Sequence, residues 1–163
     1  MEIIIQKHGD KITAYDDRTA KTYTIEELQN LASNGDSEAQ NAMGSYFFGM
    51  KSIDEAMAWF KKAAENGNAD AQWKVACPYF TGAFGVKKDS EKAEHWFRKA
   101  AEQGHAGGQA GLGACYFGKK DWANAEIWLE KAAAQGHADP NHEQTKMSLE
   151  AVKLFLKADY KPS

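Results

Sequence analysis

The fold is decided by the stretch AAENGNA at residues 63–69, which returns as AAEQGHA at residues 100–106 and as AAAQGHA at residues 132–138. A tryptophan stands four residues before each copy, at Trp59, Trp96 and Trp128. Repetition at this spacing, 37 and then 32 residues, is typical of stacked arrays of small structural units. No catalytic motif recurs in the repeated frame, so the pattern favours a protein that binds another macromolecule.

Each tryptophan belongs to a predicted amphipathic helix. Small and apolar residues fall at i, i+3, i+4 and i+7 from Ala56 to Ala63, and again from Ala93 to Ala100, which is the spacing of one helix face. These helices are expected to begin after a capping side chain and to end at a glycine in the left-handed conformation. The predicted caps are Ser52 (in a capping box with Glu55), Asp89 and Asp121, and the predicted glycines are Gly67, Gly104 and Gly136.

A second kind of helix is predicted after each glycine. It pairs with the tryptophan-bearing helix that follows it, so that every unit is a pair of helices. The residues expected to cap these helices are Asp36, Asn68, His105 and His137. Small residues are expected where the paired helix must come close, at Gly44, Ala76 and Gly113. Helices of about a dozen residues are marginal alone in water, so stacking of neighbouring pairs must stabilise them.

Two features of these second helices are unfavourable for a helix. Pro78 removes a backbone hydrogen bond, and the helix is expected to kink there or end near it. Four glycines lie between residues 107 and 113, and each lowers helix stability by about 1 kcal/mol relative to alanine. The helix that contains them is therefore expected to be the softest of the three unless tight packing holds it.

The chain divides into an N-terminal extension at residues 1–23, a helical repeat array at 24–138 and a C-terminal capping helix at 139–163. The array is read as a half-repeat followed by three repeats. A Thr24/Glu27 capping box marks the start of the half-repeat.

The two ends are not explained by the repeat. In the N-terminal extension, isoleucine-rich segments flank His8-Gly9-Asp10, a pattern typical of a small β-hairpin. Near the other end, Pro140 is compatible with the first turn of a long amphipathic helix that closes the array.

One repeat carries an extended motif between residues 71 and 106. Its residues are Tyr79, Gly82, Gly85-Val86, Asp89, Lys92-Ala93, Trp96, Lys99-Ala100-Ala101-Glu102 and Gly104-His105-Ala106. This order resembles the Sel-one-like repeat (SLR), a relative within the tetratricopeptide-repeat superfamily, with degenerate copies at residues 39–69 and 108–138. The resemblance implies an all-α fold, a right-handed α/α solenoid of antiparallel helix pairs in a tetratricopeptide-like superhelix. It also implies a role in assembling protein complexes.

Composition limits the classes of partner. The 163 residues are 43% hydrophobic and 26% charged, which is ordinary for one soluble domain. A net charge of -3 and a pI near 6.0 give no electrostatic basis for binding nucleic acid or an anionic membrane. No signal-like start and no apolar run of roughly 18 residues is present, so a cytoplasmic location is expected.

The sequence predicts no metal, no cofactor and no catalytic residue. His105 and His137 occupy a position held elsewhere by Asp36 and Asn68, so capping explains them better than metal binding. The glycines after residue 104 lack the preceding strand of a phosphate loop. Carboxylates such as Glu94 are expected to be solvated.

A hydrolase is only a remote alternative. A cysteine-rich branch of the similar family has been linked with β-lactam binding or hydrolysis, but its cysteines pair across each repeat. Cys77 and Cys115 are not at equivalent positions and are expected to be reduced thiols that pack as small apolar groups.

By analogy with the tetratricopeptide fold, a partner-binding groove is predicted on the second helices. Its residues are Asn41, Ser45, Phe48, Trp73, Cys77, Phe80, Ala110, Ala114 and Phe117. This groove is expected to be apolar and to take a helix or an extended peptide through aromatic anchors. The alternative for the three recurring phenylalanines is packing between repeats, whereas Trp73 has no aromatic counterpart in the other copies.

The function predicted from these features is a cytoplasmic adaptor or scaffold that binds a partner protein or peptide through the curved face of the array. A second hypothesis is an inhibitor or immunity protein that blocks a bacterial toxin. The sequence leaves the identity of the partner and the oligomeric state open.

Overall fold

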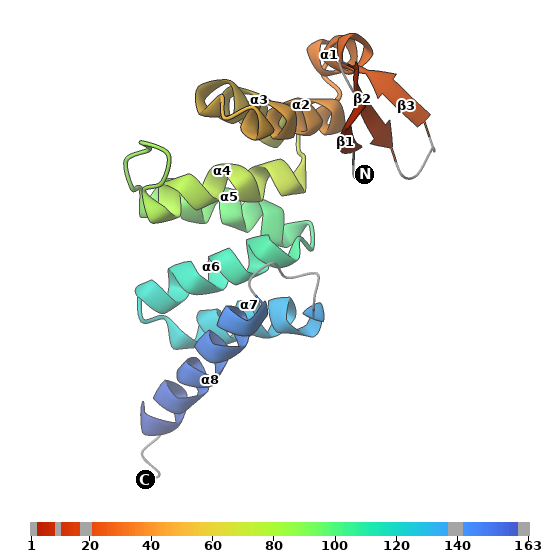
Figure 1. The fold of residues 1–163 in the computed structure, drawn as a ribbon. Helices are drawn as coiled ribbons and strands as arrows, with labels where there is room; N and C mark the ends of the chain where they lie inside the picture. Colours follow the sequence, from red (N-terminus) through yellow and green to blue (C-terminus); the bar gives the residue numbers. More distant parts are fainter. Residues whose placement is uncertain (1–2, 9–10, 17–20, 137–141, 160–163) are drawn as a thin grey trace. The chain divides into compact units, whose positions relative to one another are not determined.

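The computed structural model describes residues 3–8, 11–16, 21–136 and 142–159 (Figure 1). In these residues three strands are followed by eight helices. The chain forms two compact units, Met1–Val75 and Ala76–Ser163, and the boundary falls inside a helix. The predicted fold of paired helices is confirmed, with a small sheet added at the N-terminal end.

The three strands form one antiparallel sheet. They are β1 (Ile3–His8), β2 (Lys11–Asp16) and β3 (Lys21–Thr24), in the order β1-β2-β3. Pairing of Ile5 with Ala14 confirms the predicted hairpin, and Ala14 also pairs with Tyr23. The third strand was not predicted, although its Thr and Tyr residues have high β-propensity.

Eight helices follow the strands in the described residues. They are α1 (Ile25–Ser33), α2 (Ser37–Gly49), α3 (Ile53–Glu65), α4 (Ala69–Thr81), α5 (Ser90–Glu102), α6 (Ala106–Gly118), α7 (Trp122–Ala134) and α8 (His142–Asp159). In the first unit α1 packs on α2 and α2 on α3; in the second unit α5, α6, α7 and α8 pack each on the next. Leu28 and Met43 are central to the first core, and Leu129 and Val152 to the second.

The turns at Gly67 and Gly104, which follow α3 and α5, have the predicted geometry. Gly67 and Gly104 have φ angles of +91° and +83°. The next residue closes each turn: Asn68 N–H donates to Ala63 O at 2.9 Å, and His105 N–H donates to Ala100 O at 3.1 Å. These bonds satisfy helix-end carbonyls that would otherwise lack a partner.

The predicted capping side chains are confirmed at most positions that the structure describes. Asp36, Asn68 and His105 accept from the amides of Ala39 (2.8 Å), Ala71 (2.8 Å) and Gly108 (3.1 Å). The Thr24/Glu27 capping box is also present. His137 and Pro140 lie outside the described residues.

The predicted Ser52/Glu55 capping box is wrong. Ser52 is the N-cap residue of α3, but its side chain makes no capping hydrogen bond. Asp121 has nearly the same ψ angle, 78° against 76°, and does accept from the Asn124 amide at 3.2 Å. Because a carboxylate reaches one atom farther than a hydroxyl group, this backbone suits aspartate and not serine.

Pro78 is accommodated inside α4. The helix ends near this residue, as predicted, but it continues for three residues beyond it, to Thr81. The Pro78 carbonyl still accepts from the Gly82 amide at 2.8 Å, so the proline removes its own donor without ending the helix.

The glycines of α6 pack against neighbouring helices. A Cβ at Gly108 would lie 2.6 Å from the Ala100 Cβ and 2.8 Å from the Ala101 backbone nitrogen, and a Cβ at Gly113 would lie 2.7 Å from the Leu129 Cγ. In the first unit, a Cβ at Gly44 would lie 2.5 Å from the Phe60 ring. The small residues predicted at Gly44 and Gly113 are therefore sites of close approach, and tight packing compensates for the poor helix propensity of α6.

A buried glutamine recurs in the helix that follows each glycine turn, at Gln40 in α2, Gln72 in α4 and Gln109 in α6. In each case the side-chain amide donates to a carbonyl in the last turn of the preceding helix. The acceptors are Ala32 O at 2.9 Å, Ala64 O at 3.1 Å and Ala101 O at 3.5 Å. We call this arrangement the glutamine clamp.

The clamp also reaches the helix that follows. The Gln40 Oε1 accepts from Asn66 Nδ2 at 2.9 Å, and the Gln109 Oε1 accepts from Gln135 Nε2 at 2.7 Å. Asn66 and Gln135 are the C-cap residues of α3 and α7. One side chain therefore connects the ends of two helices to the first turn of a third.

We expect Gly108→Ala to lower the free energy of unfolding by about 1–3 kcal/mol, because the added methyl group meets backbone that cannot move cheaply. Gly118→Ala is the matched control in the same helix, since nothing lies within 4 Å of its added Cβ. It should be neutral or stabilise by a few tenths of a kcal/mol. Urea denaturation measures both, and equal effects would contradict the close approach.

We expect Gln40→Leu to cost about 1–2 kcal/mol, because it removes the hydrogen bonds that the buried Gln40 side chain makes with the Ala32 carbonyl and with Asn66. Gln29→Leu, on the exposed face of α1, is the control and should change stability by less than about 0.5 kcal/mol. Thermal and urea denaturation of the two variants give the comparison. A Gln40→Leu protein as stable as the control would show that the clamp does not hold the helices.

Candidate functional site

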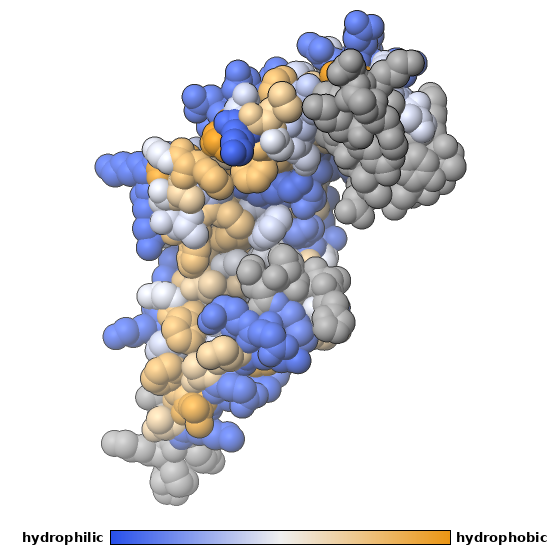
Figure 2. Space-filling view, in the orientation of Figure 1, coloured by the Kyte–Doolittle hydropathy of each residue, from blue (hydrophilic) through white to orange (hydrophobic). Residues whose placement is uncertain are grey.

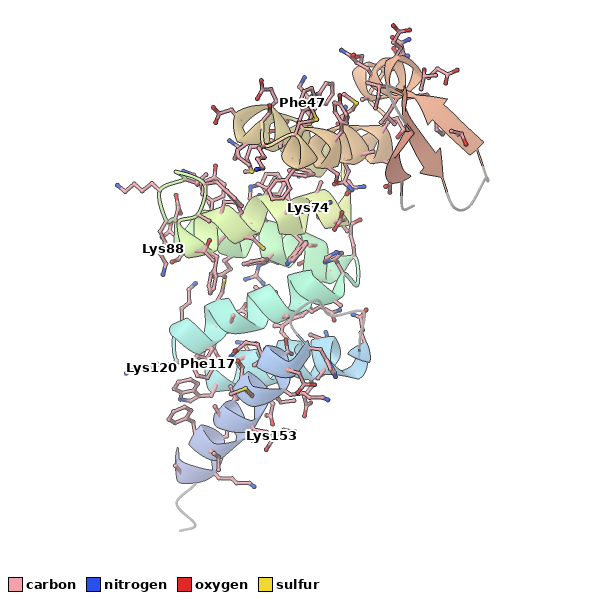
Figure 3. The ribbon with its side chains drawn as sticks, in the orientation of Figure 1. Phe47, Lys74, Lys88, Phe117, Lys120 and Lys153 are labelled. Carbon is pink, nitrogen blue, oxygen red and sulfur yellow. The ribbon has the colours of Figure 1, made fainter. Side chains whose placement is uncertain are left out.

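The predicted partner-binding surface includes residues of both units. In the first unit it carries a cluster of polar side chains. Asn41 Nδ2 donates to Asp70 Oδ2 at 2.9 Å, and Lys74 Nζ lies 2.7 Å from the same carboxylate oxygen. Lys74 also donates to Asn41 Oδ1 at 3.3 Å and to Ser45 Oγ at 3.2 Å. The predicted apolar character is therefore absent at Asn41 and Ser45, where four side chains of α2 and α4 share one hydrogen-bond network. Figure 3 labels Lys74, the member of this network that contacts the other three.

Two aromatic residues complete this part of the surface. Phe48, in the last turn of α2, is 48% exposed, and Trp73, on α4, is half-buried. The Lys74 ammonium lies 4.9 Å from the centre of the Phe60 ring. The first unit thus offers an exposed phenylalanine together with polar groups of fixed geometry.

The part of the surface in the second unit is more apolar. Cys77 and Phe80 lie on α4, and Ala110, Ala114 and Phe117 lie on α6. Ala110 is buried and the other four are half-buried.

Phe80 and Phe117 have packing partners inside the second unit. The Phe80 ring contacts Phe97 edge-to-face, with 5.8 Å between centroids. Phe117 contacts Trp122 at 5.4 Å and Phe155 at 6.4 Å, and the Trp122 and Phe155 rings are stacked at 4.5 Å. Packing was the alternative predicted for the phenylalanines. These ring contacts cover part of the side-chain surface of both Phe80 and Phe117.

The two cysteines are poorly suited to nucleophilic chemistry. Burial raises the pKa of Cys77 to about 11 and is also the main reason that the pKa of Cys115 is about 12. Both thiols are free. Because the thiolate is the reactive form, both groups are almost fully protonated and unreactive at neutral pH.

A polar network orders the end of α6 beside Phe117. Glu94, which was expected to be solvated, is only 14% exposed at its side chain. It accepts from Arg98 Nη2 at 2.8 Å and from Lys119 Nζ, and Arg98 also donates to the Tyr116 hydroxyl at 2.9 Å. Partial burial raises the pKa of Glu94, but the hydrogen bonds from Lys119 and Arg98 lower it by more, so the pKa lies below its usual value.

The recurring tryptophans each lie under a lysine one turn later on the same helix. The distances from ammonium nitrogen to ring centroid are 4.5 Å for Lys62 and Trp59, 4.8 Å for Lys99 and Trp96, and 4.2 Å for Lys131 and Trp128. Such exposed contacts stabilise by about 0.5–1 kcal/mol. The spacing of these pairs was visible in the sequence, but the contact was not predicted.

The described residues contain neither a metal-ligand cluster nor a helix that could span a membrane. Within residues 3–8, 11–16, 21–136 and 142–159, no three His, Cys, Asp or Glu side chains gather as metal ligands would. In the same part of the chain, no helix has both the length and the apolar character needed to cross a membrane.

Paired helices with shared caps, close glycine contacts and a repeated glutamine clamp define a helical-repeat protein of the tetratricopeptide type. The sequence profile described as Sel1 repeat matches residues 37–68, 69–105 and 106–137. These segments make up more than half of the sequence, and the chain belongs to the Sel1 repeat family.

Solved structures agree with this assignment. The chain is similar to a Sel1 repeat protein from Oxalobacter formigenes, with 32% identity and a TM-score of 0.66 over 78% of this chain and 97% of that one. It is 38% identical to c5321, a protective antigen of uropathogenic Escherichia coli strains that displays an SLR fold, with a TM-score of 0.61 over 69% of this chain and 26% of that one. The chain thus corresponds to about a quarter of the antigen's length.

A more distant likeness concerns the fold alone. The Sgt2 TPR domain from Aspergillus fumigatus is 20% identical, with a TM-score of 0.52 over 78% of this chain and 85% of that one. No curated protein sequence matches the chain.

We expect Glu94→Gln to lower the free energy of unfolding by about 1 kcal/mol at pH 7. A lowered pKa means that the folded state favours the charged form, so this stabilisation is present above the unfolded-state pKa of about 4.3 and is lost as the pH falls through the folded-state value. The difference from wild type should therefore shrink below about pH 4.

Glu91→Gln is the control for this measurement, because Glu91 is exposed on the same helix. Its effect should be at most a few tenths of a kcal/mol. Urea denaturation at several pH values gives the comparison. A cost of Glu94→Gln that does not change between neutral and acid pH would rule out the charged network as its source.

Proposed function

We propose that the protein is an adaptor that binds a partner protein or peptide through its second helices. Sel1 and tetratricopeptide repeats generally mediate protein–protein interaction. The proposed contact residues are Asn41, Ser45, Phe48 and Trp73 in the first unit and Cys77, Phe80, Ala110, Ala114 and Phe117 in the second. We also propose that the protein acts in the cytoplasm and has no catalytic activity of its own.

The observation that carries this proposal is the pairing of an exposed aromatic ring with polar groups of fixed geometry on α2 and α4. Phe48 is 48% exposed, and aromatic side chains supply most of the binding energy in many interfaces. Asn41, Ser45 and Lys74 lie on the same helices. Asp70 already holds Asn41 and Lys74, and Ser45 accepts a hydrogen bond from Lys74. Groups that are ordered before binding lose little entropy when a partner arrives.

The residues of the second unit are proposed to play a smaller part. Phe80 and Phe117 already have aromatic partners, so a ligand would gain only their remaining exposed surface. Trp73 has no aromatic counterpart at the equivalent positions Asn41 and Ala110, and the repeat itself does not require a tryptophan there.

The test begins with affinity capture of the full chain in its native cell, followed by mass spectrometry and a binding measurement on the purified partner. We expect Phe48→Ala and Trp73→Ala each to weaken binding at least about tenfold. Phe84→Ala is the matched control, since Phe84 is a phenylalanine of similar exposure, 53%, outside the proposed surface. Circular dichroism verifies that each variant is folded.

The proposal fails if the partner is retained equally by Phe48→Ala, Trp73→Ala and the control. The same capture experiment distinguishes an adaptor from an inhibitor or immunity protein. An immunity protein would capture a toxin whose activity is lost in the complex, whereas an adaptor leaves its partner active.

A further inference from the structure

Helix α8 has two apolar faces, and the described residues cover only one of them. Leu149 and Val152 pack with Ala125 and Leu129 of α7, and Thr145 is buried on the same face. Met147 and Leu154 are 66% and 67% exposed. Helical periodicity places these two residues on the side of α8 that faces away from α7. Figure 2 shows apolar side chains gathered at the surface in the region of α8.

The exposed face has the residue spacing of a helix–helix seam. Met147, Ala151, Leu154 and Ala158 follow one another at intervals of four, three and four residues, as the central positions of a two-helix coiled coil do. Large and small residues alternate along this row. We call these four residues the α8 seam.

We propose that the α8 seam is covered by a second copy of this chain, with the two α8 helices antiparallel around a two-fold axis. In this register Leu154 lies opposite the partner subunit's Ala151, and Met147 lies opposite the partner subunit's Ala158. Each large side chain then meets a small one, which lets the helices approach closely. Two-fold symmetry repeats both contacts.

Charge supports the same partner and the same direction. Glu150 and Lys157 lie two turns apart on one flank of the seam, and both are exposed. In the antiparallel register Glu150 faces the partner subunit's Lys157, and Lys157 faces the partner subunit's Glu150. A parallel pair would instead place leucine against leucine and alanine against alanine, and it would bring neither pair of opposite charges together.

The size of the seam sets the expected affinity. From Met147 to Ala158 it spans 12 residues, or about 17 Å at the rise of an α-helix. So short a contact buries less surface than a permanent dimer does. We expect reversible dimers with a Kd in the micromolar range, about 10–100 µM.

The experiment is analytical ultracentrifugation of the full chain from about 5 to 500 µM, a range that spans this Kd. Wild type should change from monomer to dimer without forming larger species. Glu150→Lys and Lys157→Glu should each weaken dimerisation at least about tenfold, because each places like charges opposite one another. The control Lys61→Glu makes the same change of net charge as Lys157→Glu on α3 and should dimerise as wild type does.

Mixing the two charge variants gives the decisive measurement. Glu150→Lys alone and Lys157→Glu alone are both repelled, but an equimolar mixture restores two opposite-charge pairs in the heterodimer. The mixture should therefore dimerise about as well as wild type, and so should the double variant Glu150→Lys/Lys157→Glu. Recovery on mixing also shows that neither variant is misfolded.

The proposal is overturned if wild type remains monomeric at about 500 µM. It is equally overturned if the dimer persists in the charge variants, if their mixture stays monomeric, or if Leu154→Glu dimerises like wild type. A persistent dimer would mean that another surface or a parallel arrangement holds the two copies together.

Discussion

The rest of the structure depends on the glutamine clamp. Gln40 donates to the last turn of α1 and accepts from the C-cap of α3, while its own helix runs between them. Gln109 does the same for α5 and α7. A buried amide that meets both partners contributes stability, and the same amide costs free energy wherever the helices are misaligned. The clamp therefore selects one register for each set of three helices.

The register of the helices also allows them to pack closely. The clamp fixes the ends of the helices. Gly108 then lets the start of α6 approach the end of α5, and Gly44 and Gly113 let α2 and α6 approach the helices that follow them. A helix as rich in glycine as α6 is unfavourable in isolation, but it becomes suitable where a Cβ would collide with a neighbour. Local propensity and packing thus oppose each other in α6, and packing decides the outcome.

The structural features that the sequence predicted correctly are those that depend on residues close together in the chain. Helix periodicity, the C-terminal glycines and the aspartate caps each depend on residues within one or two turns, so the sequence contains their whole explanation. Gln40 and Asn66 are 26 residues apart, and nothing local links them. The failed Ser52 cap differs from the successful Asp121 cap only in side-chain reach. Burial of Glu94 depends on how α5 meets α6, which no spacing of charges reveals.

The candidate surface was harder to predict because the repeat does not determine it. Alanine, glycine and glutamine recur at positions where neighbouring helices touch, since geometry allows little else. At one position of the second helices the three copies instead carry Asn41, Trp73 and Ala110, and the fold tolerates a polar, an aromatic and a small side chain there. A position at which the repeat accepts different side chains can be shaped by a partner. On the proposed function, differences between the copies, more than their shared motif, therefore carry the information about binding.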